Sequence, residues 1–191
     1  MQAVTNVSDE IGAKGLRGRL LKTSRRALTL IEGAMVLGLF AFVVGGAMYY
    51  YGQSNSARQV TNGLGELSSI TQAVRNLYGG QANYAGLEEE VLTESNTLPK
   101  RMVLSPGNIR SSFGSVTVAA ANTGTADSGF AITFNSVPKE VCVQMAVKDQ
   151  GRGLYSIKAG SGTADTSPPL TPAEAYAGCN GQTNTVVWTY N

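Results

Sequence analysis

The most distinctive part of the sequence is an apolar run from Leu28 to Tyr51. Its 24 residues include one charged side chain, Glu32, close to the start. At about 1.5 Å per residue, a helix over this run is roughly 36 Å long, which is enough to cross a bilayer. A carboxylate within a membrane costs about 2.5–3.5 kcal/mol on insertion scales, so Glu32 is a functional candidate. Any cation that pairs with it must come from outside the run.

After Tyr51 the pattern becomes that of an amphipathic helix. Apolar residues recur every three or four positions, with polar residues between them. These apolar positions are Val60, Leu64, Leu67, Ile70 or Thr71, Val74 and Leu77. No proline interrupts residues 28–78, so the pattern predicts one helix of about fifty residues that ends at Gly79-Gly80. A bend or a locally melted turn is expected at Gly45-Gly46, unless the glycines are simply tolerated there.

The rest of the chain predicts an α+β domain. Residues 81–112 look irregular, with a short helix over Leu87–Leu92. Two further helices are predicted, one opened by Pro138 and one by the order Thr171-Pro172-Ala173-Glu174. Strands are predicted at Ser115–Ala120, Phe130–Asn135, Leu154–Lys158 and Thr185–Tyr190. An antiparallel sheet of these strands is expected to pack on the amphipathic half of the long helix.

Charge is distributed unevenly along the chain. Residues 1–27 contain six basic and two acidic side chains, a net charge of +4, so the remaining residues carry −2 of the overall +2. A short basic segment in front of an apolar run keeps the N-terminus in the cytoplasm. The basic pI therefore reflects this leader and does not indicate a surface that binds nucleic acid.

Both cysteines, Cys142 and Cys179, come after the apolar run. With the N-terminus in the cytoplasm, they lie on the outer side of the membrane, where disulfides form and persist. A disulfide between them is expected to stabilise the fold by roughly 4 kcal/mol in the chain-entropy model. Two buried free thiols are the alternative.

The sequence offers little for catalysis. It contains no histidine, no P-loop and no complete G-x-G-x-x-G motif, and the paired cysteines leave no thiol nucleophile. Glu88-Glu89-Glu90 is a candidate cation site, although adjacent acids more often form a solvated face. Trp188 and Tyr190 alternate on a predicted strand and are expected to lie in the core. The sequence thus predicts a protein that is not an enzyme and needs no cofactor or metal.

The residues around the start of the apolar run resemble the prepilin signature of type IV pilins. The stretch reads Arg25-Arg26-Ala27-Leu28-Thr29-Leu30-Ile31-Glu32-Gly33 and continues as apolar helix to Leu39 and beyond. In that family a membrane-embedded peptidase removes a basic leader, and glutamate is the fifth residue of the product. The resemblance implies cleavage between Ala27 and Leu28, N-methylation of Leu28, and a role for Glu32 in the register between subunits.

Other features resemble the type IVb subclass. They are the long leader, leucine at the new terminus, a large globular domain and two widely spaced cysteines. The segment Thr171–Ala175 is similar to the corresponding part of bundle-forming pilins and of the thin-pilus (PilS-like) pilins of conjugative plasmids. Two features depart from the family: Ala27 stands where the family usually has glycine, and the helix-breaking proline in the apolar half is missing.

The resemblance implies a type IV pilin fold in four segments. Residues 1–27 form the cleaved leader, 28–51 the membrane and fibre-core half of the helix, 52–78 its amphipathic half, and 79–191 the α+β head. The implied function is that of a structural subunit, a major pilin, in a fibre that serves adhesion, aggregation or mating-pair contact. Copies of the chain, the prepilin peptidase and the assembly machinery (platform protein, ATPase and secretin) are the implied partners. The chain would pass from the inner membrane to an extracellular pilus.

Three other interpretations fit part of the sequence. A minor pilin or a secretion pseudopilin shares the leader and the helix. An uncut single-pass anchor that presents a periplasmic binding domain explains the span, but not Glu32 or its spacing from Ala27. A twin-arginine export signal matches Ser24-Arg25-Arg26-Ala27-Leu28, yet an acid interrupts the apolar run, which is also longer than a typical signal core.

Overall fold

The structure, a computed structural model, describes residues 30–191, and the side chains of these residues except at positions 30 and 52–54. The predicted leader, with Ala27 and Leu28, lies outside the described residues. The chain divides into two compact units, Met1–Gly45 and Gly46–Asn191.

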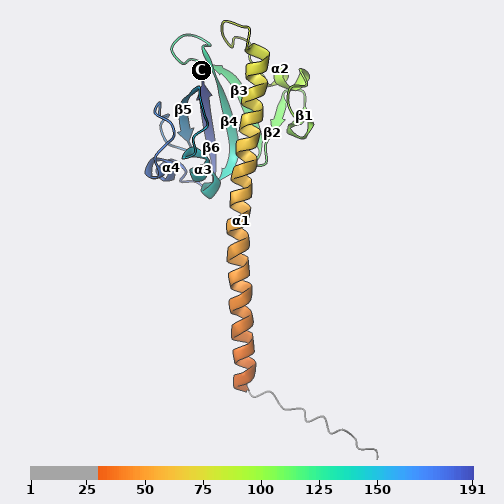
Figure 1. Cartoon of the computed structure of the whole chain (residues 1–191), viewed down its shortest axis with the longest axis vertical. Coiled ribbons are helices and arrows are strands. Elements are labelled where there is room, and N and C mark those ends of the chain that lie inside the picture. The colour runs from red at the N-terminus through yellow and green to blue at the C-terminus, as the bar shows by residue number, and fades with distance from the viewer. Residues whose placement is uncertain (1–29) are drawn as a thin grey trace, which may run out of the picture. The chain divides into compact units, whose positions relative to one another are not determined.

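The first element is one long helix, α1, which runs from Leu30 to Tyr78 (Figure 1). It ends where predicted, because Gly79 and Gly80 form a turn. No locally melted turn occurs at Gly45-Gly46, since both residues are α-helical. Glycine lowers helix stability by roughly 1 kcal/mol but still donates its backbone hydrogen bond, so the pair does not interrupt the helix.

Ten further elements form the head. They are α2 (Glu89–Glu94), the 3-10 helix η1 (Lys100–Met102), β1 (Val103–Ser105), β2 (Asn108–Arg110), β3 (Ser115–Ala121), β4 (Gly129–Pro138), α3 (Lys139–Ala146), β5 (Leu154–Ala159), α4 (Pro172–Gly178) and β6 (Thr183–Tyr190). The strands make one antiparallel sheet in the order β1-β2-β3-β4-β6-β5. β1 and β5 are therefore its two edges, and Figure 1 shows them on opposite sides of the head.

One face of this sheet forms the core. Along β4 and β6 buried and partly exposed residues alternate, as expected for a sheet with one covered face. The register pairs Phe130 with Tyr190, Ile132 with Trp188 and Phe134 with Val186, so these side chains share a face. Phe134 meets Trp188 edge-on with ring centroids 5.3 Å apart. The predictions that Trp188 and Tyr190 are core residues are confirmed, with exposed fractions of 0% and 2%.

The amphipathic half of α1 covers this face. Val60, Leu67, Ile70 and Val74 are buried, and Leu64 and Leu77 pack partly against the same cluster. The predicted apolar stripe is therefore confirmed, with Ile70 rather than Thr71 at its centre.

The strands after residue 112 start within two residues of their predicted positions, whereas the region before it differs. Residues 81–112 are not irregular: they contain η1, β1 and β2, and the predicted helix is shifted to Glu89–Glu94. Strands of three residues are too short to show a period of two, so the sequence pattern does not reveal them. Pro138 is the last residue of β4 and caps α3 from outside the helix.

Candidate assembly interface

The apolar half of α1 exposes nearly all of its large side chains. From Ile31 to Tyr51 their exposed fractions range from 60% at Val43 to 81% at Phe42. By length and composition the helix can cross a membrane, and its most apolar part is not buried within the chain. A contiguous apolar surface of this kind marks contact with lipid or with other protein chains. This surface is the main candidate for assembly.

Glu32 lies in the first turn of α1 and is exposed. An acid in this position interacts favourably with the partial positive charge at a helix N-terminus. The cleavage residues Ala27 and Leu28 lie outside the described residues, so their relation to Glu32 remains a prediction.

A buried acid, Glu66, attaches the head to α1. Its carboxylate accepts two hydrogen bonds from Ser112, one from the backbone N–H at 2.9 Å and one from the hydroxyl at 2.7 Å. Glu66 is one of the polar residues that alternate with the apolar positions of the helix, and the pattern therefore predicts that it is exposed. That prediction is wrong, because only 7% of the residue is exposed. The loop between β2 and β3 folds over this turn of α1 and supplies the donors.

Gly63, one turn before Glu66 on α1, lies against Phe113, the residue that follows Ser112 in the same loop. A Cβ at Gly63 would lie 2.6 Å from the ring of Phe113, so only glycine leaves space for that ring. Gly63 and Glu66 thus both fix the position of the Ser111–Gly114 loop on α1. The position of Gly63 between the apolar residues Val60 and Leu67 is the signal from which this contact could have been predicted.

Arg75, in the last turn of α1, connects the C-terminal end of the amphipathic half to the head. Its guanidinium donates a hydrogen bond to the Arg152 carbonyl at 3.2 Å and lies 5.7 Å from the centre of the Tyr190 ring. Burial raises the pKa of the Tyr190 phenol, although a hydrogen bond with Thr71 and the charge of Arg75 act in the opposite direction. The C-terminal strand is therefore fixed to the last turns of α1.

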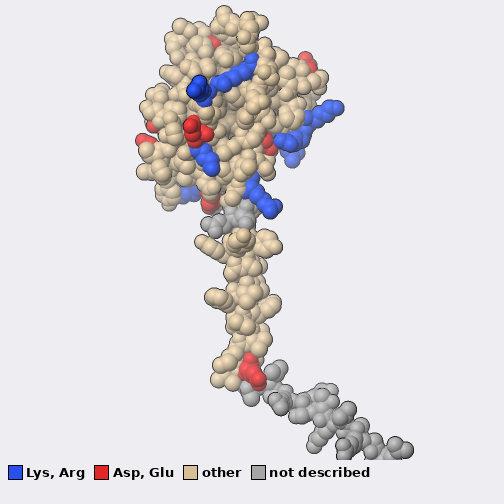
Figure 2. All heavy atoms as spheres, viewed as in Figure 1, with Lys and Arg blue, Asp and Glu red and all other residues tan. Residues whose placement is uncertain are grey.

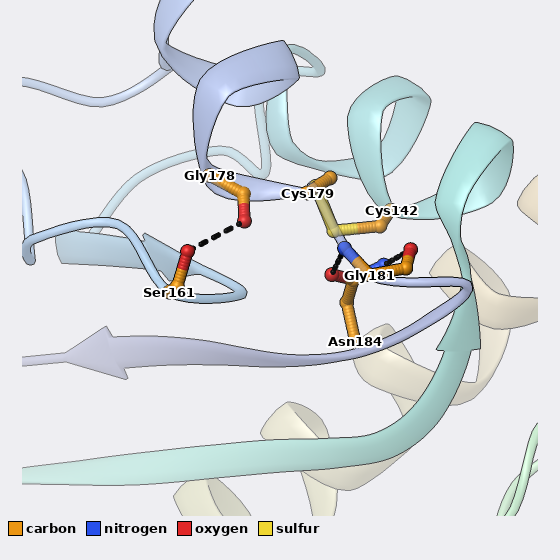
Figure 3. The surroundings of a disulfide bond; sticks show 6 residues. All are labelled: Cys142, Ser161, Gly178, Cys179, Gly181 and Asn184. Carbon is orange, nitrogen blue, oxygen red and sulfur yellow. Dashed lines mark hydrogen bonds between the residues drawn. A yellow bond between two sulfur atoms is a disulfide. The ribbon is translucent and has the colours of Figure 1, made fainter.

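The predicted disulfide joins α3 to the end of α4 (Figure 3). The Cα atoms of Cys142 and Cys179 are 6.0 Å apart, and both residues are fully buried. Beside them Asn184 accepts a hydrogen bond from the Gly181 N–H at 3.1 Å and donates one to the Gly181 carbonyl at 2.8 Å. The disulfide thus fixes the C-terminal end of α4 to α3, and the Asn184 hydrogen bonds fix the chain that follows α4 to β6.

The start of α4 is a complete capping box. Thr171 accepts a hydrogen bond from the Glu174 N–H, and the Glu174 carboxylate accepts one from the Thr171 N–H. Hydrogen bonds from the Thr171 side chain and backbone hold the pKa of the exposed Glu174 carboxyl below its ordinary value. The helix start predicted from Thr171-Pro172-Ala173-Glu174 is confirmed.

Comparison with known proteins gives a consistent result. The family model described as PilS N terminal matches residues 57–191. The major structural subunit of the bundle-forming pilus from Escherichia coli O127:H6 is 32% identical over 184 residues, which cover 88% of this chain and 95% of that protein. The chain belongs to the type IVb pilins. The corresponding subunit from Escherichia coli O111:H- is 31% identical to this pilin over the same shares of both chains.

Solved structures agree with this assignment. A type IVb pilin from Salmonella typhi superimposes on the pilin with a TM-score of 0.56 and 25% identity, over 68% of this chain and 97% of that one. TcpA, a type IV pilin from Vibrio cholerae El Tor biotype, gives a TM-score of 0.50 at 15% identity, over 70% and 99% of the two chains. The second likeness shows the common fold alone.

The candidate acids Glu88–Glu90 lie at the start of α2 and just before it. Glu89 accepts a hydrogen bond from the Val118 N–H at 3.0 Å and so covers part of the β3 edge that β2 leaves open. No group of three His, Cys, Asp or Glu side chains is placed to bind a metal among the residues that the structure describes. Glu89 therefore has a structural contact, and Glu88–Glu90 does not form a cation site with other acids in this part of the chain.

Proposed function

We propose that this pilin is the precursor of the repeating subunit of a type IVb pilus. The observation that carries the proposal is the exposure of the large apolar side chains from Ile31 to Tyr51 in a chain whose head has the type IVb fold. In the precursor, lipid covers this surface. In the fibre, the equivalent helices of neighbouring subunits replace the lipid, and small residues such as Gly38 allow them to approach closely.

Processing would create the group with which Glu32 pairs between subunits. Cleavage between Ala27 and Leu28 leaves an α-amino group four residues before Glu32, and N-methylation keeps that amine basic. In the apolar fibre core a carboxylate is costly unless it is paired, so a subunit placed out of register is disfavoured. The amine of Leu28 in one subunit and Glu32 in a neighbour would therefore fix the register of assembly.

The names of the two Escherichia coli relatives support a major subunit rather than a minor pilin or a pseudopilin. Each relative is described as the major structural subunit of a bundle-forming pilus. The pilin would act by self-assembly and not as an enzyme. It would be a substrate of the prepilin peptidase and a cargo of the platform protein, the assembly ATPase and the secretin. The finished fibre, outside the cell, would serve adhesion, aggregation or mating-pair contact.

The experiment that tests this proposal is N-terminal sequencing and intact-mass measurement of the pilin, both from membranes and from sheared surface fibres of its native host. We expect fibres made mainly of a chain that begins at methylated Leu28. A chain that still begins near Met1 would indicate the uncut anchor, and one that begins after Tyr51 would indicate an export signal. A correctly processed chain that forms only a trace component of the fibres would indicate a minor pilin.

A further inference from the structure

The strand β3 has a free edge in the middle of the sheet. On one side, β4 pairs with β3 from Val116 to Ala121. On the other side, β2 pairs only with Ser115 and Val116, so within the described part of the chain no strand lies beside Thr117–Ala121. The N–H and C=O groups along such an edge are a template for pairing with another chain.

The sequence of β3 does nothing to prevent this pairing. Ser115–Ala121 reads Ser-Val-Thr-Val-Ala-Ala-Ala and contains no charge, no proline and no glycine. Uncharged segments of this length without proline are prone to pair between chains when they are exposed at an edge. Many edge strands carry a lysine or a proline that blocks such pairing. Any protection of β3 must therefore come from another element.

The helix α2 supplies this protection through Glu89. Its carboxylate accepts a hydrogen bond from the Val118 N–H at 3.0 Å. Because this N–H is directed away from β4, it is the group to which a carbonyl of an added strand would bind. A carboxylate oxygen only accepts hydrogen bonds, so it cannot bond to that carbonyl. An added strand must therefore first displace Glu89.

The helix is held over the β3 edge by contacts of its own. Leu92 and Thr93 of α2 are buried. The Thr93 hydroxyl accepts a hydrogen bond from the Gly107 N–H, just before β2, at 2.9 Å. The helix thus packs against both β2 and β3. Glu89 therefore reaches the edge from an anchored helix and not from a free loop.

The charges around this edge are of both signs. Figure 2 shows acid on the side of the head where Figure 1 places α2, with basic side chains nearby. The exposed acids are Glu88, Glu90 and Glu94, and the exposed bases are Lys100, Arg101 and Arg110. The net charge of the region therefore does not keep a second copy of the chain away. The protection depends on the one carboxylate that is bonded to β3.

We propose that Glu89 is a gatekeeper, which prevents the β3 edges of two pilin copies from pairing with each other. The pairing that it prevents is antiparallel and centred on Ala119, the middle residue of the free segment. A two-fold dimer of this kind uses the same surface on both subunits and is closed. It would withdraw subunits from any larger assembly. The inference goes beyond the proposed function, since it concerns the chain before assembly.

Cysteine crosslinking of the full-length pilin in detergent tests the proposal. Ala119 is exposed, and in the proposed dimer its Cα would lie about 4.5 Å from its counterpart, which is close enough for a disulfide. With Ala119→Cys as the reporter, we expect at least tenfold more disulfide-linked dimer after mild oxidation in Glu89→Ala than with Glu89 retained. Glu90→Ala, which removes the exposed neighbouring carboxylate, is the matched control and should stay within twofold. Equal amounts of dimer in the two variants would overturn the proposal.

Glu89→Gln separates the hydrogen bond from the charge. Glutamine is neutral but keeps an oxygen that can accept the Val118 N–H. With the same reporter, this variant should therefore form dimer within twofold of the chain that retains Glu89. A yield as high as that of Glu89→Ala would overturn the role of the hydrogen bond, on which the proposal rests.

Hydrogen exchange of the unmodified pilin gives a readout that needs no variant. The Val118 N–H should exchange at least a hundredfold more slowly than in an unfolded chain, because Glu89 holds it. Exchange at the unprotected rate would overturn the proposal, and this measurement decides if Glu89→Ala does not accumulate. Both experiments use unassembled pilin, so their results do not depend on whether the chain forms fibres.

Discussion

Glu66 on α1 and Ser112 in the loop before β3 are 46 residues apart in the sequence and form two hydrogen bonds, at 2.9 and 2.7 Å. Because the carboxylate is buried, its loss leaves a backbone N–H without an acceptor. We expect Glu66→Ala to destabilise the head by about 1–3 kcal/mol. For a domain of this size, that lowers the melting temperature by roughly 2–10 °C. Thermal unfolding of the unassembled pilin in detergent measures the effect, with the exposed Glu94→Ala as its control.

Gly63→Ala and Gly65→Ala form a matched pair with opposite expected effects. Alanine is favoured over glycine within a helix by about 1 kcal/mol, and Gly65 has nothing within 4 Å of an added Cβ, so Gly65→Ala should raise the melting temperature. At Gly63 the same methyl would meet the Phe113 ring at 2.6 Å, and we expect a net destabilisation of about 1–3 kcal/mol. Similar shifts in both variants would mean that the Phe113 ring can move away at little cost.

Glu32→Val should separate processing from assembly. The leader should be removed as in the unmodified chain, since the residues on either side of the cut are unchanged. Fibre yield should fall at least tenfold, because the proposed pairing with the terminal amine of a neighbour is lost. Immunoblots of membranes and of sheared fibres measure both quantities, and Glu94→Val in the head removes a carboxylate without this effect. Normal amounts of fibre from Glu32→Val would contradict the assembly role.

The disulfide should resist reduction in the folded protein. Both sulfur atoms belong to fully buried residues, so a thiol reagent reaches them only after local or global unfolding. We expect the non-reduced mass to be two hydrogens below that of the free dithiol, and dithiothreitol without denaturant to leave it unchanged over hours. The double variant Cys142→Ser/Cys179→Ser should lose roughly 4 kcal/mol of stability, the chain-entropy value for a loop closed over 37 residues. Rapid reduction without denaturant would show that this region opens readily.

Alkaline pH should destabilise the head through Tyr190. Its pKa is raised above the ordinary 10.0 in the folded state, so above pH 10 the unfolded chain releases the phenolic proton first. Stability from this group is complete below pH 10 and is lost as the pH rises through the folded pKa. Denaturant midpoints between pH 8 and pH 11.5 measure the decline, which Tyr190→Phe should make shallower. An equal decline in the variant would assign the effect to other groups, such as Tyr78, whose pKa burial also raises.

Those parts of the fold that follow from a repeating pattern were predictable from the sequence. The stripe from Val60 to Val74, the alternation along β6 and the capping box at Thr171 each reflect a periodicity or a local motif. The short strands β1 and β2 show no such period, and Glu66 reads as a surface residue because its partner lies 46 positions away. Likewise, nothing local places β1 and β5 at opposite edges of one sheet, since that depends on the strand order. Contacts distant in the sequence required the structure.

The disulfide also determines what happens when the exposed chain is cut. The loop at residues 160–169 is largely exposed and lies between Cys142 and Cys179 in the sequence. Such loops are preferred sites of proteolytic nicking. A protease that cleaves this loop would leave two polypeptides that remain covalently joined, so the damaged subunit would keep its place and its neighbours in the fibre. The proposed pilus, once outside the cell, would therefore tolerate many such cuts without being severed.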